Sequence, residues 1–172
     1  MGDLHPLEGS VCVAPFYFED MIRSLIHRFK FRGKHALGAP MAAYIAQAAL
    51  ALPPSSLVSW VPVSRVRLRR RGYDQSEVLA RETALRLGLP LATTLRKVRD
   101  VPTQNRLVGK DARVRNVAGA FAPAAGSAAG CGVLLVDDVC TSGATLEECV
   151  RVLRRDGARS VVCAVFARTR RG

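Results

Sequence analysis

One short segment restricts the possible folds more than any other, because an apolar run leads through a polar loop into a helical pattern. The run Gly132–Val136 has the length and composition of a buried β-strand. A helix is expected from about Gly143 to Arg155, and Gly157 stands where helices commonly end in a left-handed residue. A strand that leads into a helix in this way is typical of an α/β fold.

Strand and helix patterns alternate from residue 57 onward. The apolar runs Leu57–Val63 and Ser160–Ala167 predict buried strands, and Asp74 has the spacing to Glu77 that predicts the start of a helix. This alternation favours a parallel sheet with helices on its faces. Ligands of such sheets bind at the carboxyl ends of the strands. The residues that follow Val63 and Val136 are therefore expected at a shared rim.

Two helical patterns, over residues 18–32 and 37–52, precede this alternating region. We therefore expect an α/β domain over residues 16–172, with a parallel sheet, flanking helices and an N-terminal helical portion. Residues 1–15 are expected to form a short N-terminal extension. Residues 64–72, which carry five arginines, are predicted to form a basic loop.

The charge of the chain is strongly positive and unevenly distributed. Lys and Arg number 26 against 14 Asp and Glu, a net charge of +12, and 22 of the 26 cations are Arg. Residues 65–115 carry a net charge of +9 and residues 151–172 a net charge of +6. Because the planar guanidinium suits phosphate, an anionic partner is expected. Genome composition is the alternative explanation for the preference for Arg.

The composition also argues against several classes of protein. The five cysteines include no C-x-x-C pair, which argues against a disulfide framework and against a zinc site. No apolar run approaches the roughly 18 residues needed to cross a bilayer. The first residues lack the basic and then apolar plan of a signal peptide. We expect a cytoplasmic protein that binds no zinc and does not insert into a membrane.

The most specific chemistry lies in the sequence VLLVDDVCTSGAT, residues 133–145. Two carboxylates, Asp137 and Asp138, follow the apolar run, and hydroxyl residues and a glycine follow them. Loop amides, hydroxyls and a helix N-terminus together make a phosphate cradle. The carboxylates suit polyol hydroxyls or a phosphate-bound Mg²⁺. A phosphate beside a diol indicates a ribose phosphate, and an ordinary strand-to-helix turn is the alternative.

This sequence resembles the phosphoribosyl pyrophosphate (PRPP) signature of the phosphoribosyltransferases, and the match is complete across residues 133–145. The resemblance implies a Rossmann-like phosphoribosyltransferase fold that binds PRPP with Mg²⁺. It implies that Asp137 and Asp138 are the catalytic pair, bind the ribose hydroxyls and hold Mg²⁺, directly or through water or ligand. The phosphate-binding residues it implies are Thr141, Ser142, Gly143, Ala144 and Thr145 for the 5′-phosphate and Val63, Ser64 and Arg65 for the pyrophosphate.

Further blocks of sequence resemble the ComF/ComFC family, whose members are phosphoribosyltransferase-like proteins linked to DNA uptake during natural transformation. These blocks are Leu25–Gly33, Val61–Ser64, Arg69–Ser76 and a segment from Thr103 to Phe121. Members of the family commonly begin with a Cys-rich zinc-binding segment. This chain departs from that pattern, because Cys12 is its only cysteine before residue 131.

The sequence is compatible with two functions. The first is a DNA-uptake protein that retains a PRPP site and binds single-stranded DNA through a basic surface, with other DNA-uptake or recombination proteins as candidate partners. The second is an active Mg²⁺-dependent phosphoribosyltransferase with an unidentified nucleobase-like acceptor. Cations contact phosphates and aromatic rings stack on bases, so the DNA-binding candidates are Arg69, Arg70, Arg71, Tyr73, Arg106, Lys110 and Arg113. An exposed charged turn is the alternative for Arg69 to Tyr73. For Arg106, Lys110 and Arg113 the alternative is a flexible loop that closes over PRPP, which the segment Lys97–Arg115 resembles.

Overall fold

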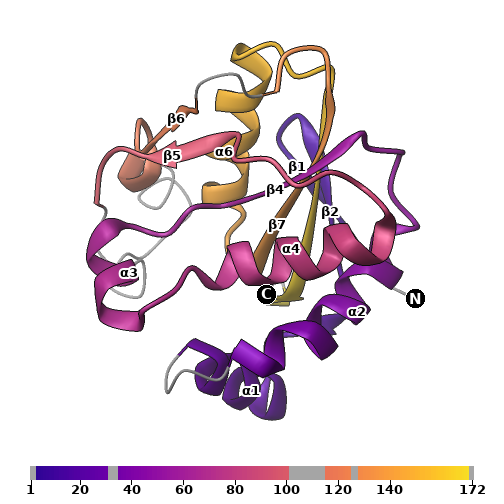
Figure 1. Ribbon diagram of the computed structural model, residues 1–172, viewed down its shortest axis with the longest axis vertical. Coiled ribbons are helices and arrows are strands. Elements are labelled where there is room, and N and C mark those ends of the chain that lie inside the picture. Colours follow the sequence, from indigo (N-terminus) through magenta and orange to yellow (C-terminus); the bar gives the residue numbers. More distant parts are fainter. Residues whose placement is uncertain (1–2, 31–34, 101–114, 125–127, 171–172) are drawn as a thin grey trace.

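A computed structural model of the protein describes residues 3–30, 35–100, 115–124 and 128–170. A central sheet has the strand order β1-β2-β8-β7-β4, and β3 pairs with β8 (Figure 1). The strands of this sheet are β1 (Asp3–Leu7), β2 (Ser10–Ala14), β3 (Phe16–Tyr17), β4 (Leu57–Trp60), β7 (Gly132–Cys140) and β8 (Ser160–Arg168).

The middle of the sheet is parallel, which confirms the predicted architecture. β4 pairs with β7 in parallel, with Trp60 beside Val136, and β7 pairs with β8 in parallel, with Val136 beside Ala164. β2 also runs parallel to β8, and only β1 is antiparallel to its neighbour. The carboxyl ends of β4, β7 and β8 therefore lie along one edge of the sheet.

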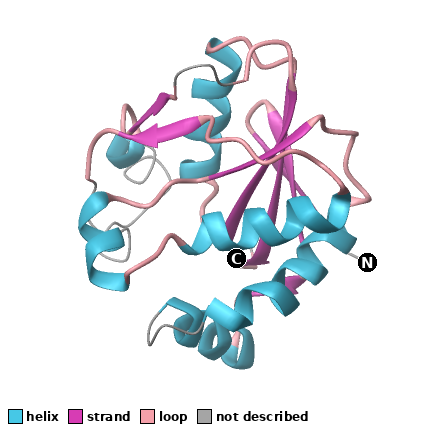
Figure 2. Ribbon diagram, in the orientation of Figure 1, coloured by secondary structure: helices cyan, strands magenta, loops and turns pink. Residues whose placement is uncertain are grey.

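Helices cover both faces of the sheet (Figure 2). The helices α1 (Asp20–Lys30), α2 (Gly38–Ala49) and α4 (Gln75–Leu87) lie on one face. On the other face lie α6 (Ala144–Arg155) and a small antiparallel sheet of β5 (Leu95–Lys97) and β6 (Phe121–Pro123). A 3-10 turn, η1 (His35–Leu37), precedes α2. Among the described residues, no helix combines the length and the apolar character needed to cross a membrane.

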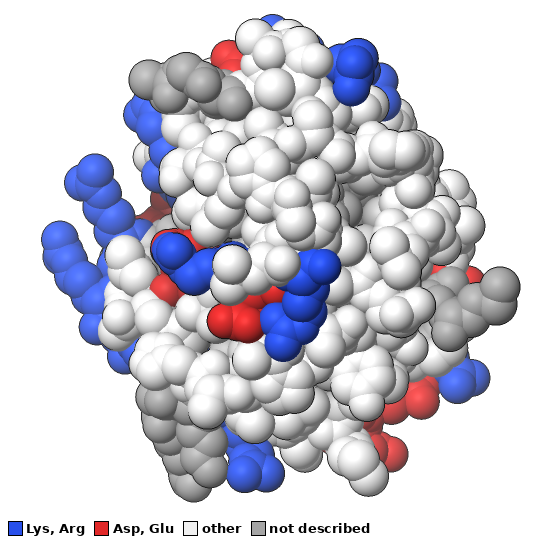
Figure 3. All heavy atoms as spheres, turned by 45° about the vertical axis from the view of Figure 1, so that its right-hand side comes forward, with Lys and Arg blue, Asp and Glu red and all other residues white. Residues whose placement is uncertain are grey.

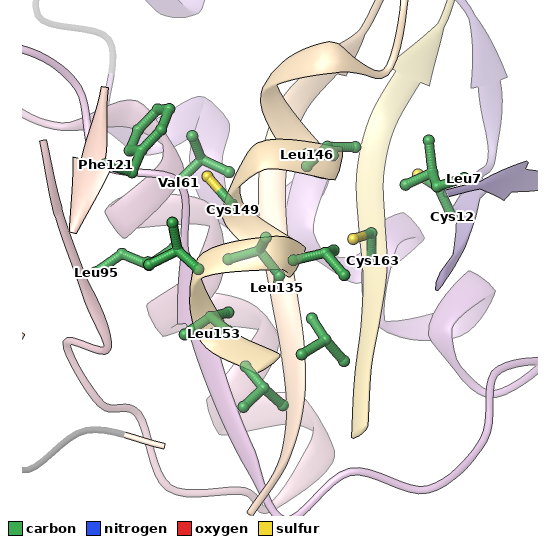
Figure 4. Packing of buried hydrophobic residues seen from close by; sticks show 14 of the residues in the cluster. Leu7, Cys12, Val61, Leu95, Phe121, Leu135, Leu146, Cys149, Leu153 and Cys163 are labelled. Carbon is green, nitrogen blue, oxygen red and sulfur yellow. The ribbon is translucent and has the colours of Figure 1, made fainter. Parts of the chain in front are cut away.

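Two apolar clusters, one on each side of the sheet, form the core. Figure 4 shows the first, in which side chains of α6 such as Leu146 and Leu153 pack toward Leu135 of β7 and Cys163 of β8. The second holds side chains of α1, α2 and α4 against the opposite face of the same strands. Strands that are buried on both faces are read as continuous apolar runs, which is why the sequence reveals β7 and β8 so clearly.

No strand is predicted for residues 1–15, yet β1 and β2 form a hairpin that extends the sheet. Pro6 weakens the strand pattern of β1, but a strand at the edge of a sheet tolerates proline because its outward N–H needs no partner. Cys12 and Val13 of β2 are fully buried. The N-terminal segment therefore contributes to the core.

The predicted basic loop at residues 64–72 is wrong, because most of it forms the helix α3 (Arg65–Arg71). The hydroxyl of Ser64 accepts a hydrogen bond of 3.3 Å from the amide of Arg67, and Gly72 ends the helix at φ +82°. Arginine is a good helix former, and this helix is capped at both ends. None of the residues of α3 is fully buried.

Candidate functional site at the carboxyl edge of the sheet

The acidic pair lies inside a strand and not after it. The strand was expected to end at Val136, but β7 continues to Cys140, whose partner on β8 is Arg168. Asp137 and Asp138 are therefore fixed by the sheet's own hydrogen bonds. A fixed backbone gives the two carboxylates defined positions before any ligand arrives.

Two hydrogen bonds from neighbouring groups of the protein hold the carboxylate of Asp137. Its Oδ1 accepts a hydrogen bond of 2.7 Å from the hydroxyl of Ser76, at the start of α4, and another of 2.8 Å from the amide of Asp138. The pKa of Asp137 is raised to about 7, because burial and then the negative charge of Asp138 raise it by more than the two hydrogen bonds and the charge of Lys30 lower it. Desolvation is the main reason why this carboxyl titrates near neutrality.

Asp138 is held by a cation from a distant part of the chain. The ammonium of Lys30, the last residue of α1, lies 2.6 Å from Oδ2 of Asp138. Arg71 adds positive charge nearby: its guanidinium is half-buried, burial lowers its pKa, and the charge of Asp138 opposes that shift. The pair therefore has carboxylates of different character, one bonded to a hydroxyl and one paired with an ammonium.

Hydrogen bonds hold the segment after β4 beside β7 and beside the start of α4. The amide of Val61 donates to the carbonyl of Val136 over 3.0 Å. The amide of Val63 donates to Oδ2 of Asp74 over 2.9 Å, and Oδ1 of Asp74 accepts from the amide of Ser76. Asp74 thus caps α4 and fastens the loop after β4 at the same time.

This arrangement changes what the predicted pyrophosphate loop offers. The amide of Val63 already has a partner, and the hydroxyl of Ser64 is engaged in capping α3. The side chain of Arg65 is exposed. Of the three residues predicted to bind pyrophosphate, Arg65 is therefore the one with an exposed side chain at this rim.

The loop after β7 has the features of an anion site. Gly143 adopts φ +84°, and a Cβ there would meet Leu7 Cδ2 at 2.8 Å, so any other residue would be strained and would displace Leu7. The hydroxyl of Ser142 is buried and, within the described structure, has no hydrogen-bond partner. The N-cap residue of α6 is Gly143, which has no side chain to cap the helix. A small pocket is lined by Asp137, Val139, Cys140, Thr141, Ser142, Gly143, Thr145 and Leu146.

The residue after β8 holds this loop in place. The amide of Thr169 donates to the carbonyl of Cys140 over 3.0 Å, and its hydroxyl donates to the carbonyl of Thr141 over 2.9 Å. Both carbonyls are therefore engaged by Thr169, which fixes the backbone on either side of the start of the loop.

The predicted DNA-binding residues differ in their exposure to solvent. Tyr73 is buried, its hydroxyl donates to the carbonyl of Phe29, and its ring packs on Phe29 and His35, so its predicted base-stacking role is wrong. Arg69 and Arg70 are exposed on α3, whereas Arg71 is half-buried near Asp138. The predicted residues Arg106, Lys110 and Arg113 lie outside the described residues.

Three residues of the site, Lys30, Asp74 and Ser76, are absent from the site residues predicted by sequence. Each lies in a block that resembles the ComF/ComFC family, and that resemblance is the only sequence signal that marks them. Asp74 is predicted as a helix cap but not as an anchor of the neighbouring loop. The pairing of Lys30 with Asp138 joins positions 108 residues apart, which local patterns do not reveal.

Comparison with known proteins gives the family. The model of the phosphoribosyl transferase domain matches residues 74–172, more than half of the chain. The chain is 34% identical over 153 residues to DNA utilization protein YhgH of Salmonella typhi, covering 84% of this chain and 66% of that protein. It is 31% identical over 156 residues to Competence protein F of Haemophilus influenzae, covering 84% of this chain and 67% of that protein.

Solved structures agree on the fold. The B. subtilis glutamine PRPP amidotransferase superposes with a TM-score of 0.53 at 24% identity, over 76% of this chain and 26% of that one. The allosteric regulatory enzyme of purine biosynthesis gives a TM-score of 0.52 at 24% identity, over 76% and 25%. The match of the domain model over more than half of the chain shows that it belongs to the phosphoribosyl transferase domain family. Its similarity to Competence protein F along most of its length makes it a member, more narrowly, of the ComF family.

Proposed function

We propose that this protein binds PRPP at the carboxyl edge of its sheet. We also propose that it takes part in the uptake and utilization of DNA by the cell. The buried, unpartnered hydroxyl of Ser142 carries the first half of the proposal. A buried polar group without a partner costs free energy, and an incoming phosphate oxygen would satisfy it. The second half follows from the names of the relatives, DNA utilization protein YhgH and Competence protein F.

Each part of PRPP has a matching group at this edge. The 5′-phosphate would accept hydrogen bonds from the loop of residues 141–145 and from amides at the start of α6, whose N-cap residue Gly143 has no side chain. The ribose hydroxyls would donate to Asp137 and Asp138. The pyrophosphate would lie toward Arg65, whose forked guanidinium suits bidentate contact with phosphate.

The two carboxylates also fit the Mg²⁺ that such a ligand carries. Carboxylate oxygens are ligands that Mg²⁺ prefers, and the ion is commonly held by one or two carboxylates together with substrate phosphates. Among the described residues, no group of three or more His, Cys, Asp or Glu side chains could hold a metal ion. Asp137 and Asp138 would hold Mg²⁺ together with the ligand, and the ion would neutralise part of the pyrophosphate charge.

Calorimetric titration with PRPP and Mg²⁺ tests the proposed site. We expect Asp137→Asn and Asp138→Asn each to weaken binding at least tenfold. Asp156→Asn removes one negative charge at the opposite end of α6 and is the matched control, for which we expect unchanged affinity. A wild-type protein that neither binds PRPP nor gains thermal stability from it would overturn the proposal, because a ligand of the folded state must stabilise that state. Release of pyrophosphate with a nucleobase acceptor would instead favour an active transferase.

The exposed arginines of α3 support single-stranded DNA as the second ligand. α3 has five arginines and no acidic residue in seven positions, and Arg69 and Arg70 are exposed at its end. Figure 3 shows how unevenly the charge is spread, with cations projecting beyond one edge and much of the facing surface uncharged. A run of cations on one helix suits the phosphates of a flexible strand.

Salt dependence tests this second ligand. Each phosphate contact on single-stranded DNA contributes about −0.7 to the slope of log K against log salt. We expect replacement of Arg69 and Arg70 by Ala to make the slope shallower by about 1.4. The control is replacement of Arg154 and Arg155, two exposed arginines at the far end of α6, which removes the same charge. Equal slopes for the two double variants would assign binding to net charge alone and reject the α3 surface.

A further inference from the structure

The ion pair between Lys30 and Asp138 brings a resident cation to the proposed ligand site. Nζ of Lys30 lies 2.6 Å from Oδ2 of Asp138, and the two side chains are 25% and 10% exposed. A pair this sheltered is screened less by salt than a surface pair. Lys30 ends α1, so the contact ties the N-terminal helices to the strand that carries the acidic pair.

Within the part of the chain that the structure describes, Lys30 contacts the carboxylate that accepts no hydrogen bond from the neighbouring hydroxyl of Ser76. Asp137 accepts the hydroxyl of Ser76 and the amide of Asp138 at a single oxygen. Asp138 has its Oδ2 directed to Lys30. A divalent cation that used both carboxylates would therefore have to share Asp138 with an ammonium already in contact with it.

Positive charge from α3 strengthens this effect. Arg71 lies close enough to Asp138 for the two charges to attract each other, and its guanidinium donates a hydrogen bond to Gln75 that fixes its position. A bare metal ion approaching Asp138 would be repelled by both cations. A ligand that brings phosphate groups would be attracted by both of them.

We propose that Lys30 acts as the resident counter-cation of the acidic pair, so that the site disfavours a bare divalent cation and selects a ribose phosphate that carries its own negative charge. This inference rests on the proposed PRPP site. When the ribose hydroxyls reach Asp138, the ammonium of Lys30 can turn to a phosphate oxygen of the ligand. Ligand binding then depends less on Mg²⁺ than the two carboxylates alone would suggest.

Metal titration without any other ligand is the first test. Mn²⁺, whose free and bound forms differ in their electron paramagnetic resonance signal, is the probe for wild type, Lys30→Met and Lys30→Arg. We expect Lys30→Met to bind Mn²⁺ at least tenfold more tightly than wild type, and Lys30→Arg to behave as wild type. Arg28→Met is the matched control, because it removes an exposed cation from the same helix. Equal Mn²⁺ affinity of wild type and Lys30→Met would overturn the inference.

Calorimetry with PRPP is the second test and separates the two proposals. We expect wild type to bind PRPP with an affinity that changes less than threefold when EDTA removes Mg²⁺. For Lys30→Met we expect a loss of at least tenfold on the same treatment. If no variant binds PRPP under either condition, the proposed function fails, while the Mn²⁺ titration still decides the role of Lys30. A wild-type protein that loses PRPP binding completely in EDTA would reject the role of Lys30 while keeping the PRPP site.

Discussion

The hydroxyl of Ser76 donates a hydrogen bond of 2.7 Å to Oδ1 of Asp137, and this bond joins the first turn of α4 to the strand that carries the acidic pair. Ser76 is itself nearly inaccessible, at 2% exposure. Its amide donates to Asp74, the residue that also holds the amide of Val63. The carboxylate, the helix start and the loop after β4 are therefore one connected unit.

Replacement of Ser76 by Ala tests the importance of this unit for ligand binding. The loss of one hydrogen bond to a charged carboxylate is worth about 1.5–3 kcal/mol, which corresponds to a roughly ten- to hundredfold lower affinity for PRPP. The measurement is calorimetric titration of both proteins at the same pH. Thr83→Val removes a hydroxyl from the same helix far from the site and is expected to leave the affinity unchanged. Equal affinities for Ser76→Ala and wild type would show that the bond does not position Asp137.

The substitution Thr83→Val is also expected to stabilise the folded protein. Thr83 is fully buried, and its Oγ1 is among the few buried side-chain atoms that have no hydrogen-bond partner in the described part of the chain. Valine has the same shape without the hydroxyl, so the substitution removes an unsatisfied polar group. We expect a gain of about 1 kcal/mol, which raises Tm by about 2–4 °C in a domain of this size. A lower Tm in differential scanning calorimetry would contradict the prediction.

Gly143 lies in the loop of residues 141–145 and Gly88 lies outside it, so the same substitution at the two positions tests whether this loop binds phosphate. Both have positive φ, +84° and +65°, so alanine at either position costs about 1–2 kcal/mol of backbone strain. Only at Gly143 would the new Cβ meet a neighbour, Leu7 Cδ2 at 2.8 Å, since Gly88 has open space. We expect Gly143→Ala to lose more stability than Gly88→Ala in chemical denaturation.

The same pair of variants separates binding from stability. We expect Gly143→Ala to lose PRPP binding at a temperature where both variants remain folded, as circular dichroism would show. Gly88 ends α4 away from the loop of residues 141–145. The variant Gly88→Ala is therefore expected to bind PRPP as wild type does. Retained binding by Gly143→Ala would place the phosphate elsewhere.

Glu148 of α6 makes a pH-dependent contribution to stability. Its carboxylate accepts a hydrogen bond of 2.8 Å from the amide of Gly119 and is paired with Arg151 at 2.6 Å. Burial raises the pKa of Glu148, but the bonds from Arg151 and Gly119 lower it by more, so the net shift is below the ordinary value of 4.5. The stabilisation is therefore present above pH 4.5 and is lost as the pH falls through the folded-state pKa.

Glu148→Gln measures this contribution. We expect a loss of about 1–3 kcal/mol of unfolding free energy at pH 7, because the buried carboxylate loses its charge and its pairing with the more exposed Arg151. The difference from wild type should shrink as the pH falls below 4.5, in urea denaturation followed by fluorescence of Trp60. Glu82→Gln breaks a more exposed pair with Arg86 and is expected to cost less, about 0–1 kcal/mol. A difference for Glu148→Gln that is independent of pH would contradict the assignment.

The sequence reveals the parts of this protein whose signal is local. The apolar runs of β7 and β8 predict buried parallel strands because both faces of each strand are covered, and the run of residues 133–145 predicts the acidic pair and its loop. The sequence also contains local signals for the helix α3. Ser64 and Gly72 are cap residues at its two ends, but the density of arginine between them suggested a loop.

The remaining features depend on contacts between distant residues. Tyr73 looks like an exposed aromatic within a basic cluster, but its ring is buried by contacts with Phe29 of α1 and with His35 of η1. Residues 3–14 look like an extension because the edge strand β1 contains Pro6, and β8 supplies the pairing that makes them part of the sheet.

The sequence by itself determined the class of this protein, an α/β phosphoribosyltransferase domain with an acidic pair and a phosphate loop, because that motif is contiguous and its chemistry depends on neighbouring residues. Only the tertiary structure decided how the pair is held. Lys30 reaches Asp138 across 108 positions of sequence, and Ser76 reaches Asp137 across 61. Such contacts form through the packing of α1 and α4 on the sheet, and no local periodicity encodes which cation or hydroxyl will arrive there.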